Sequence, residues 1–275
     1  MTANRGVLAV ITNDPTRVFQ RDVISGLNEV ALGRGYRTQI VQVATRPATL
    51  ESLGLDAGRV RGALVIATAL PDPLLGALAE TGIALSLISH QVPGLDIPAI
   101  MPNNRQGIAL LVEHMVRACG RTRPVFIRGD MDQNDGRQRD MAFGQEMLRY
   151  HLSAPPEHRL RGDFEPDIAA QSLRAFLAQG IAFDAVIASD YLMAVAAVTV
   201  LREAGIAVPD QVAVAGFGDG PEAAAAGLTT VAADVVELGR RGGRQLIGQV
   251  EGLRVRGLTL LSTELIIRAT TAPAR

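Results

Sequence analysis

The feature of this sequence that most constrains its fold is the repeated alternation of short apolar runs with amphipathic segments. The run Val7–Thr12 has the length and the branched residues of a buried strand. The next segment, residues 17–32, has apolar residues at helical spacing, and Gly33 and Gly35 end it as glycines commonly end helices. Because strands that alternate with helices form parallel sheets covered by helices, the predicted fold class is α/β.

The same alternation continues along the chain. Further strands are predicted at residues 38–43, 62–67, 84–88, 99–101, 124–127, 158–161, 185–188, 212–215, 229–231 and 258–267. Further helices are predicted at residues 48–57, 73–81, 105–118, 138–150, 168–178, 192–204 and 235–250. Two successive series of such units indicate two doubly wound, Rossmann-like lobes, whose ligands bind at the carboxyl ends of the strands.

Composition excludes several classes of protein. The chain has 275 residues, of which 48% are hydrophobic, so it can bury a large core and is not intrinsically disordered as a whole. Its 27 basic and 28 acidic residues give a net charge of −1, which is not the basic balance of a non-specific nucleic-acid binder. No secretory signal and no run of 18 apolar residues are visible, so we expect a soluble, cytoplasmic chain without membrane contact.

The residues that usually carry catalysis or cofactor binding form no recognisable motif. The single cysteine, Cys119, excludes an internal disulfide and a multi-cysteine zinc site, and we expect it to be buried. The chain has no lysine and therefore no Walker phosphate loop, and the turn after the first strand has no glycine fingerprint. We find no nucleophile elbow and no metal-binding histidine motif. The pattern favours binding over catalysis, with no catalytic residue, metal or cofactor.

Nine local phrases, in order, carry a family resemblance. They are VFQRDVISGL (18–27), RVRGALVI (59–66), NNRQGIALLVEHM (103–115), RDMAF (139–143), GDFEP (162–166), ASDYLMAVAA (188–197), VPDQVAVAGFGD (208–219), LTTV (228–231) and LIIR (265–268). Together they resemble the effector-binding domain of the LacI/GalR family of bacterial transcription regulators, which shares the type I periplasmic sugar-binding-protein fold. The resemblance covers residues 6–270.

The resemblance implies two lobes joined by three crossovers, near residues 128–130, 232–234 and 252–257. The N-terminal lobe would comprise residues 6–128 plus 234–252, and the C-terminal lobe residues 129–232 plus 257–270. A small effector, which the resemblance implies to be a sugar or a related metabolite, would bind in the cleft between the lobes and close them, and this closure is the allosteric signal of a repressor of this type. A homodimer is implied, with residues 48–57, 71–81 and 192–204 as the expected interface. The chain has no helix-turn-helix, so operator DNA would be bound only through a segment absent from it.

Matching positions give nine candidate ligand-binding residues. Those expected in the N-terminal lobe are Phe19 and Gln20, at the start of the first helix, and Ser89 and His90, after the fourth strand. Those expected in the C-terminal lobe are Arg139, Phe164, Asp190, Tyr191 and Asp219. Arg139 can hold two hydroxyls or a carboxylate, and the two phenylalanines can stack on a ring. Asp190 can cap the next helix or contact the ligand, and His90 can pair with a hydroxyl.

The sequence also departs from the family pattern at polar anchors. Gly218 stands where the first aspartate of the family phrase GFDD would be, and Ser189 stands where an asparagine is frequent. Ala233 replaces a common glutamine, and Asn103 replaces the aspartate of the family's DN phrase. Because a site built for sugar hydroxyls loses discrimination when its polar partners are lost, we expect either an effector other than a standard hexose held by that aspartate or a site that has drifted from sugar binding.

Two alternatives remain open beside the regulator. The chain could be a solute-binding or sensor module without DNA-binding helices, for which the phrase NDGRQR (134–139) gives some support. An enzyme on an α/β scaffold is the third reading, and no sequence motif supports it.

Overall fold

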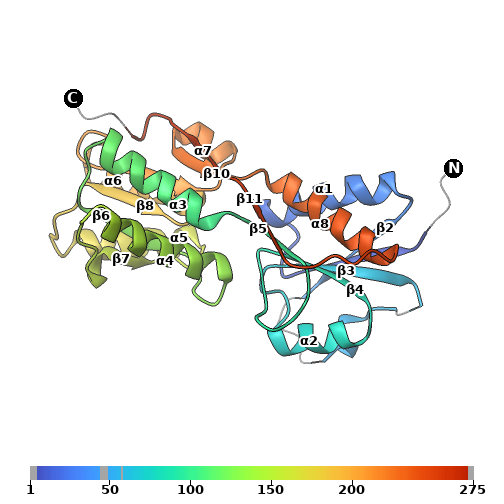
Figure 1. Ribbon diagram of the computed structural model, residues 1–275. Coiled ribbons are helices and arrows are strands. Elements are labelled where there is room, and N and C mark those ends of the chain that lie inside the picture. The colour runs from blue at the N-terminus through green and yellow to red at the C-terminus, as the bar shows by residue number, and fades with distance from the viewer. Residues whose placement is uncertain (1–4, 44–48, 57, 272–275) are drawn as a thin grey trace. The chain divides into compact units, whose positions relative to one another are not determined.

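The computed structural model describes residues 5–43, 49–56 and 58–271, which form two α/β units (Figure 1). Unit 1 comprises Met1–Pro102 and Asp234–Leu261, and unit 2 comprises Asn103–Ala233 and Ser262–Arg275. Each unit has its own six-stranded sheet and its own apolar core. The prediction of two doubly wound α/β lobes is therefore confirmed.

Unit 1 has a sheet in which every pair of neighbouring strands is parallel. Its order is β11-β5-β4-β3-β1-β2. The strands are β1 (Val7–Thr12), β2 (Arg37–Gln42), β3 (Val60–Ile66), β4 (Ala84–Ile88), β5 (Ala99–Pro102) and β11 (Leu258–Leu261). The helices are α1 (Val18–Gly33), α2 (Asp72–Glu80) and α8 (Val235–Val250), with a 3-10 turn, η1, at Glu51–Leu53. Residues 8–11 and 63–65 of the central strands are completely buried.

Unit 2 has a second sheet, of order β12-β10-β9-β8-β6-β7, that is parallel except for β12 against β10. The strands are β6 (Pro124–Arg128), β7 (Arg159–Arg161), β8 (Ala185–Ala188), β9 (Ala213–Phe217), β10 (Thr229–Ala232) and β12 (Glu264–Ile266). The helices are α3 (Asn104–Glu113), α4 (Asn134–Arg149), α5 (Pro166–Leu177), α6 (Tyr191–Glu203) and α7 (Pro221–Ala226). A π-helical turn, η2 (His114–Ala118), extends α3, and a 3-10 turn, η3, spans Pro156–His158.

The predicted lobe boundaries are wrong at two of the three crossovers. The chain passes between the units after Pro102, after Ala233 and after Leu261, so only the crossover near 232–234 was placed correctly. Residues 103–128 belong to unit 2 because β6 pairs with β7 and β8 there. The side chain of Phe126 is fully buried in that unit, where it stacks on Phe143 with ring centroids 4.6 Å apart.

Several predicted elements also need correction. The single strand expected at residues 258–267 is two strands, β11 and β12, which belong to different sheets. The helix expected at residues 48–57 is only the turn η1, with residues 48 and 57 lying outside the described part. The helix expected at 105–118 changes to a π turn at His114, α4 begins four residues before the expected start at 138, and α7 was not predicted. The remaining elements lie within two residues of their predicted bounds.

Helices α1 and α8 pack side by side on one face of the unit 1 sheet, and they do so through glycines (Figure 1). A Cβ atom on Gly239 would lie 2.0 Å from the carbonyl oxygen of Val23. A Cβ atom on Gly26 would lie 2.0 Å from the carbonyl oxygen of Val236. Since real Cβ atoms do not approach backbone this closely, each helix needs a glycine where it crosses the other.

The C-terminal segment of unit 2 is attached to the sheet by a charged pair. The guanidinium of Arg268 donates two hydrogen bonds to the carboxylate of Asp219, each 2.8 Å long, and a third to the carbonyl of Leu228, also 2.8 Å. The hydroxyl of Thr230 donates to the same carboxylate at 3.0 Å. The hydrogen bond from Arg268 is the largest of the causes that hold the pKa of Asp219 below its ordinary value.

Replacing Gly239 tests the helix crossing. We expect Gly239→Ala to lower the free energy of unfolding by about 1–3 kcal/mol, because the helices must separate to accept the methyl group. The matched control is Gly33→Ala, since a Cβ atom there has no atom within 4 Å. That control should raise the free energy by up to about 1 kcal/mol through better helix propensity. Urea unfolding followed by circular dichroism measures both, and equal effects would contradict the crossing.

Replacing Arg268 tests the charged pair and its pH dependence. We expect Arg268→Gln to lower the free energy of unfolding by about 2 kcal/mol at pH 7. A folded-state pKa below the ordinary value of 3.8 gives stability that is complete above that pH and is lost as pH falls through the folded pKa. The difference between the wild type and Arg268→Gln should therefore shrink below pH 3.8. The control is Arg174→Gln, which removes an exposed ion pair between Arg174 and Glu203. This variant should change the free energy of unfolding little, both at pH 7 and below pH 3.8.

Candidate functional site

Arg139 lies at the centre of a buried polar network in unit 2. Its side chain comes from α4 and is 9% exposed. Its Nε donates to Asn104 Oδ1 at 2.7 Å, its Nη1 to the carbonyl of Ser189 at 2.6 Å, and its Nη2 to Asp135 Oδ2 at 3.4 Å. The guanidinium carbon lies 3.7 Å from the centre of the Phe217 ring, which adds a cation–π contact. Arg139 thus joins the carboxyl ends of β8 and β9 to helices α3 and α4.

The electrostatics of Arg139 follow from this burial. Burial lowers the pKa of the guanidinium, and the carboxylates of Asp135 and Asp190 act in the opposite direction. Asn104 is fixed as well, because its amide donates to Asp135 and to Gln138, each at 2.8 Å. Three of the five N–H groups of Arg139 therefore serve protein acceptors in this structure. Its principal role here is to position its neighbours, and contact with a ligand stays a prediction.

Phe164 adopts a backbone conformation that is uncommon for a large side chain. Its φ is +60°, and the preceding Asp163 has φ +54°. The ring packs on Gly129, directly after β6, where a Cβ atom would lie 2.2 Å from the ring. The ring centre is 5.8 Å from the guanidinium carbon of Arg139. Because left-handed backbone in such residues is strained and persists mainly where function needs it, Phe164 is the strongest ring-stacking candidate in unit 2.

The other candidates in unit 2 have structural partners. Asp190 caps α6, since its carboxylate accepts from the backbone N–H of Leu192 at 2.8 Å and of Met193 at 3.3 Å. Tyr191 is buried, and its hydroxyl donates to Glu222 at 3.3 Å. Both carboxylate oxygens of Asp219 accept from Arg268. Of the two roles left open for Asp190, the cap is the one that the structure contains.

Two residues that depart from the family pattern have local structural roles. Gly218 has φ +87°, and a Cβ atom there would lie 3.1 Å from the Tyr191 ring. An aspartate at position 218 would therefore be strained in this loop. Asn103 has a capping role, because its side chain accepts from the backbone N–H of Gln106 at 3.1 Å at the start of α3.

Unit 1 places its candidates after the carboxyl ends of β1 and β4. Ser89 and His90 are buried directly after β4, and Ser89 has φ +54°. The Nε2 atom of His90 lies 2.8 Å from the carboxylate of Asp72, at the start of α2. Phe19 and Gln20 are half-buried in the first turn of α1. The sequence thus located these four residues correctly on their elements, and their contact with a ligand stays a prediction.

Several buried polar atoms at strand carboxyl ends have no hydrogen-bond partner within the described part of the protein. In unit 1 these are Thr12 Oγ1, Ser89 Oγ and His90 Nδ1. In unit 2 they are Arg128 Nε and Ser189 Oγ. Because an unpaired buried polar group costs about 1–3 kcal/mol, such groups are available to bind a polar ligand. Thr12 and Arg128 were not among the ligand-binding residues predicted from the sequence. Thr12 is the last residue of β1, as predicted, and Arg128 is the last residue of β6, one residue beyond the predicted end.

Other chemistry receives no support from the described residues. No three His, Cys, Asp or Glu side chains in that part of the chain are placed to hold a metal ion. Cys119 is buried as expected, and burial raises the pKa of its thiol, which makes it less reactive. Among the described helices, none is long and apolar enough to cross a membrane.

Comparison with known proteins identifies the family. The sequence model of the periplasmic binding protein-like domain family matches residues 112–271, more than half of the chain. The helix-turn-helix-type transcriptional regulator CelR of Thermobifida fusca is 28% identical over 91% of this chain and 75% of its own length. The transcriptional repressor PurR of Haemophilus influenzae (strain PittEE) is 23% identical over 98% of this chain and 82% of its own length.

Solved structures agree with this result. A structure described as a complex of the transcriptional regulator CelR with cellobiose is 26% identical, with a TM-score of 0.85 over 98% of this chain and 86% of that one. The lac repressor dimer bound to operator and an anti-inducer is 21% identical, with a TM-score of 0.86 over 97% of this chain and 94% of that one, and shows the same fold. The chain therefore belongs to the family of periplasmic binding protein-like domains, and it is an effector-binding domain of the LacI type.

Proposed function

We propose that this chain is the effector-binding and dimerisation domain of a ligand-responsive bacterial transcription regulator and that its effector is a saccharide. The regulators that it resembles include the CelR and PurR proteins, and this favours the function of a regulator over that of a solute-binding module or an enzyme. The observation that carries the proposal is Phe164, held with φ +60° on Gly129 and 5.8 Å from the guanidinium carbon of Arg139. A regulator of this type acts in the cytoplasm.

The choice of a saccharide rests on the chemistry of unit 2. An aromatic ring offers a flat apolar face, on which the C–H face of a sugar ring packs well. Ser189 Oγ and Arg128 Nε are buried polar atoms that can pair with hydroxyl groups. A solved structure with the same fold is a complex of the transcriptional regulator CelR with the disaccharide cellobiose. We therefore choose β-linked disaccharides as the first ligands to test.

We do not expect an aspartate carboxylate to hold the sugar hydroxyls in unit 2. Both oxygens of Asp219 are engaged by Arg268, and position 218 is a glycine. Asp190 is engaged as the cap of α6. Ring stacking and hydroxyl donors therefore supply the recognition in unit 2. Thr12, Ser89 and His90 of unit 1 offer further polar atoms, and an effector that contacts both units stays a prediction from the family resemblance.

A ligand screen tests the proposal directly. We expect a disaccharide, with cellobiose tried first, to raise the midpoint of thermal unfolding of this chain. At 100 times its dissociation constant, a ligand of the folded state adds about 2.7 kcal/mol to the free energy of unfolding. Monosaccharides and purines are the comparison ligands in the same screen. A purine that stabilises the chain while no saccharide does would contradict the proposed effector class.

Two phenylalanine variants locate the site. Phe164→Leu should weaken saccharide binding at least 10-fold, measured by isothermal titration, because it removes the stacking face. Phe183→Leu is the matched control, since Phe183 is also partly buried but packs on Phe176 before the amino end of β8. An unchanged affinity in Phe164→Leu would exclude this site. Arg139→Ala is a poorer test, because it would leave Asn104 and Asp135 without their buried partner.

The same function requires a homodimer, as in the lac repressor dimer that shares this fold. Light scattering during size-exclusion chromatography should give twice the chain mass of 29.1 kDa. A single-chain mass at all concentrations up to 100 times the working concentration would contradict dimerisation. The interface expected at residues 48–57, 71–81 and 192–204 stays a prediction.

A further inference from the structure

The amino-terminal edge of the unit 1 sheet collects arginine side chains. Because all six strands run parallel, their amino ends lie along one edge, opposite the carboxyl ends described above. Arginines stand at or just before the amino ends of four of these strands and at the end of α1. They are Arg37 at β2, Arg5 before β1, Arg59 and Arg61 at β3, Arg254 and Arg256 before β11, and Arg34 after α1.

Backbone contacts place one group of these arginines together. The N–H of Arg5 donates to the carbonyl of Gly35 at 2.9 Å, and the N–H of Arg37 donates to the carbonyl of Gly6 at 3.1 Å. The N–H of Val7 donates to the carbonyl of Arg59 at 3.2 Å. The side chain of Arg61 lies over Gly6, where a Cβ atom would be 2.5 Å from its Cγ. The starts of β1, β2 and β3 therefore form one arginine-bearing surface.

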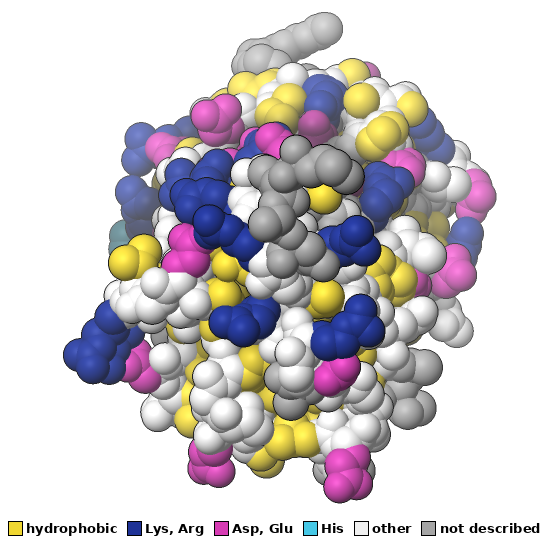
Figure 2. All heavy atoms as spheres, turned by 90° about the vertical axis from the view of Figure 1, so that its right-hand side faces the viewer, with side chains coloured by type: hydrophobic (Ala, Val, Ile, Leu, Met, Phe, Trp, Pro, Cys, Tyr) yellow, Lys and Arg dark blue, Asp and Glu magenta, His cyan; other side chains and the backbone are white. Residues whose placement is uncertain are grey.

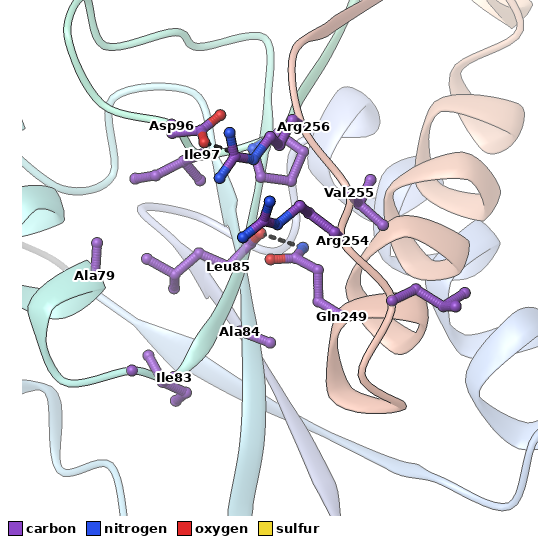
Figure 3. A pocket seen from close by; sticks show the side chains of 13 residues that line it. Ala79, Ile83, Ala84, Leu85, Asp96, Ile97, Gln249, Arg254, Val255 and Arg256 are labelled. Carbon is purple, nitrogen blue, oxygen red and sulfur yellow. Dashed lines mark hydrogen bonds and ion pairs between the residues drawn. The ribbon is translucent and has the colours of Figure 1, made fainter.

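Two adjoining hollows connect this group to Arg254 and Arg256. One hollow, of about 490 Å³, is lined by Arg61 and by Gly82, Ile83, Ala84 and Gln249. The other, of about 360 Å³, shares these last four residues and is lined by Arg254 and Arg256 (Figure 3). Figure 3 shows the Arg254 and Arg256 side chains on the same side of this pocket, with Gln249 bonded to the carbonyl of Leu85 at 2.7 Å.

Most of these arginines lack a carboxylate partner. Arg5 and Arg34 share Glu251, and Arg256 pairs with Asp96 at 2.8 Å. Within the described ranges, the side chains of Arg37, Arg59, Arg61 and Arg254 make no hydrogen bond or ion pair, and all four residues are exposed. An acidic residue, Asp56, also lies beside Arg59, whose backbone N–H donates to the carbonyl of Asp56 at 2.9 Å. Figure 2, in which the right-hand side of Figure 1 faces the viewer, shows arginine side chains distributed over this face.

We infer that this arginine edge binds the phosphate backbone of duplex DNA without reading its sequence. Five steps between strands of about 4.8 Å make an edge about 24 Å long, which matches about seven base pairs of duplex at 3.4 Å each. The net charge of −1 for the whole chain conceals this edge, where four of the seven arginines have no carboxylate partner among the described residues. The contact would add sequence-independent affinity to whatever segment reads an operator, and it does not depend on the identity of the effector.

DNA binding by this chain alone tests the inference. Fluorescence anisotropy with a labelled 20-base-pair duplex of arbitrary sequence should give saturable binding at 50 mM salt. If four arginines neutralise phosphates, log K should fall with log salt with a slope of about −3.6, which is about a 150-fold loss of affinity between 50 and 200 mM. No binding at 50 mM salt with the chain at 1 mM would overturn the inference.

A pair of charge-matched variants locates the contact. Arg59→Gln with Arg254→Gln should make the salt slope shallower by about 2 and weaken binding at 50 mM salt at least 10-fold. The control is Arg105→Gln with Arg202→Gln, two exposed arginines of unit 2 that lose the same charge. The control should keep the wild-type slope. Equal losses in both double variants would overturn the inference, because the effect would then be one of net charge. Circular dichroism checks that each variant is folded.

Discussion

The parallel direction of the strands is the constraint on which both units depend. A parallel strand cannot follow its neighbour through a tight turn, so each connection must cross the sheet, and helices cover its faces. The same constraint places every carboxyl end of a sheet at one edge and every amino end at the other. In unit 1, the carboxyl edge has Thr12, Ser89 and His90, while the amino edge has the unpaired arginines. Two surfaces of different chemistry thus result from one strand direction.

Backbone conformation has as much influence on the candidate site as side-chain type. Ser89, directly after β4, and Phe164, in the loop after β7, both have a positive φ. These residues turn the chain at the carboxyl edge of each sheet. Gly129 and Gly218 lie where a side chain would meet Phe164 and Tyr191. A glycine at position 218 therefore reflects the packing of Tyr191 as well as the loss of a polar anchor. The polar residues around it are engaged with each other before any ligand arrives.

Much of the fold could be predicted from the sequence, because apolar periodicity reports burial within one strand or helix. The strands Val7–Thr12, Ala84–Ile88 and Ala185–Ala188 were predicted at their observed bounds. The same periodicity does not report which sheet a strand joins. Residues 258–267 therefore read as one strand, although β11 and β12 belong to different units. Likewise, the family resemblance assigned residues 124–127 to the N-terminal lobe, although β6 pairs with β7 and β8 of unit 2.

The candidate site was predictable to a smaller extent. The positions of Phe164, Ser89 and His90 at strand ends followed from local phrases and predicted strands. The pairing of Asp219 with Arg268 could not be foreseen, because 49 residues separate them along the chain. The same holds for Arg139 and Asn104, which are 35 residues apart. Such pairs depend on tertiary structure, and no local motif contains them.

The division of unit 1 along the chain has a consequence during synthesis. Helix α8 and strand β11 complete this unit, yet they follow about 130 residues of unit 2. At roughly 5–20 residues per second, a ribosome adds them on the order of ten seconds after Pro102. Until then, the face of α1 that contains Val23, Gly26 and Leu27 has no helix to cover it. The nascent protein therefore exposes an apolar surface for that time, and a chaperone that protects it would act before the second unit is finished.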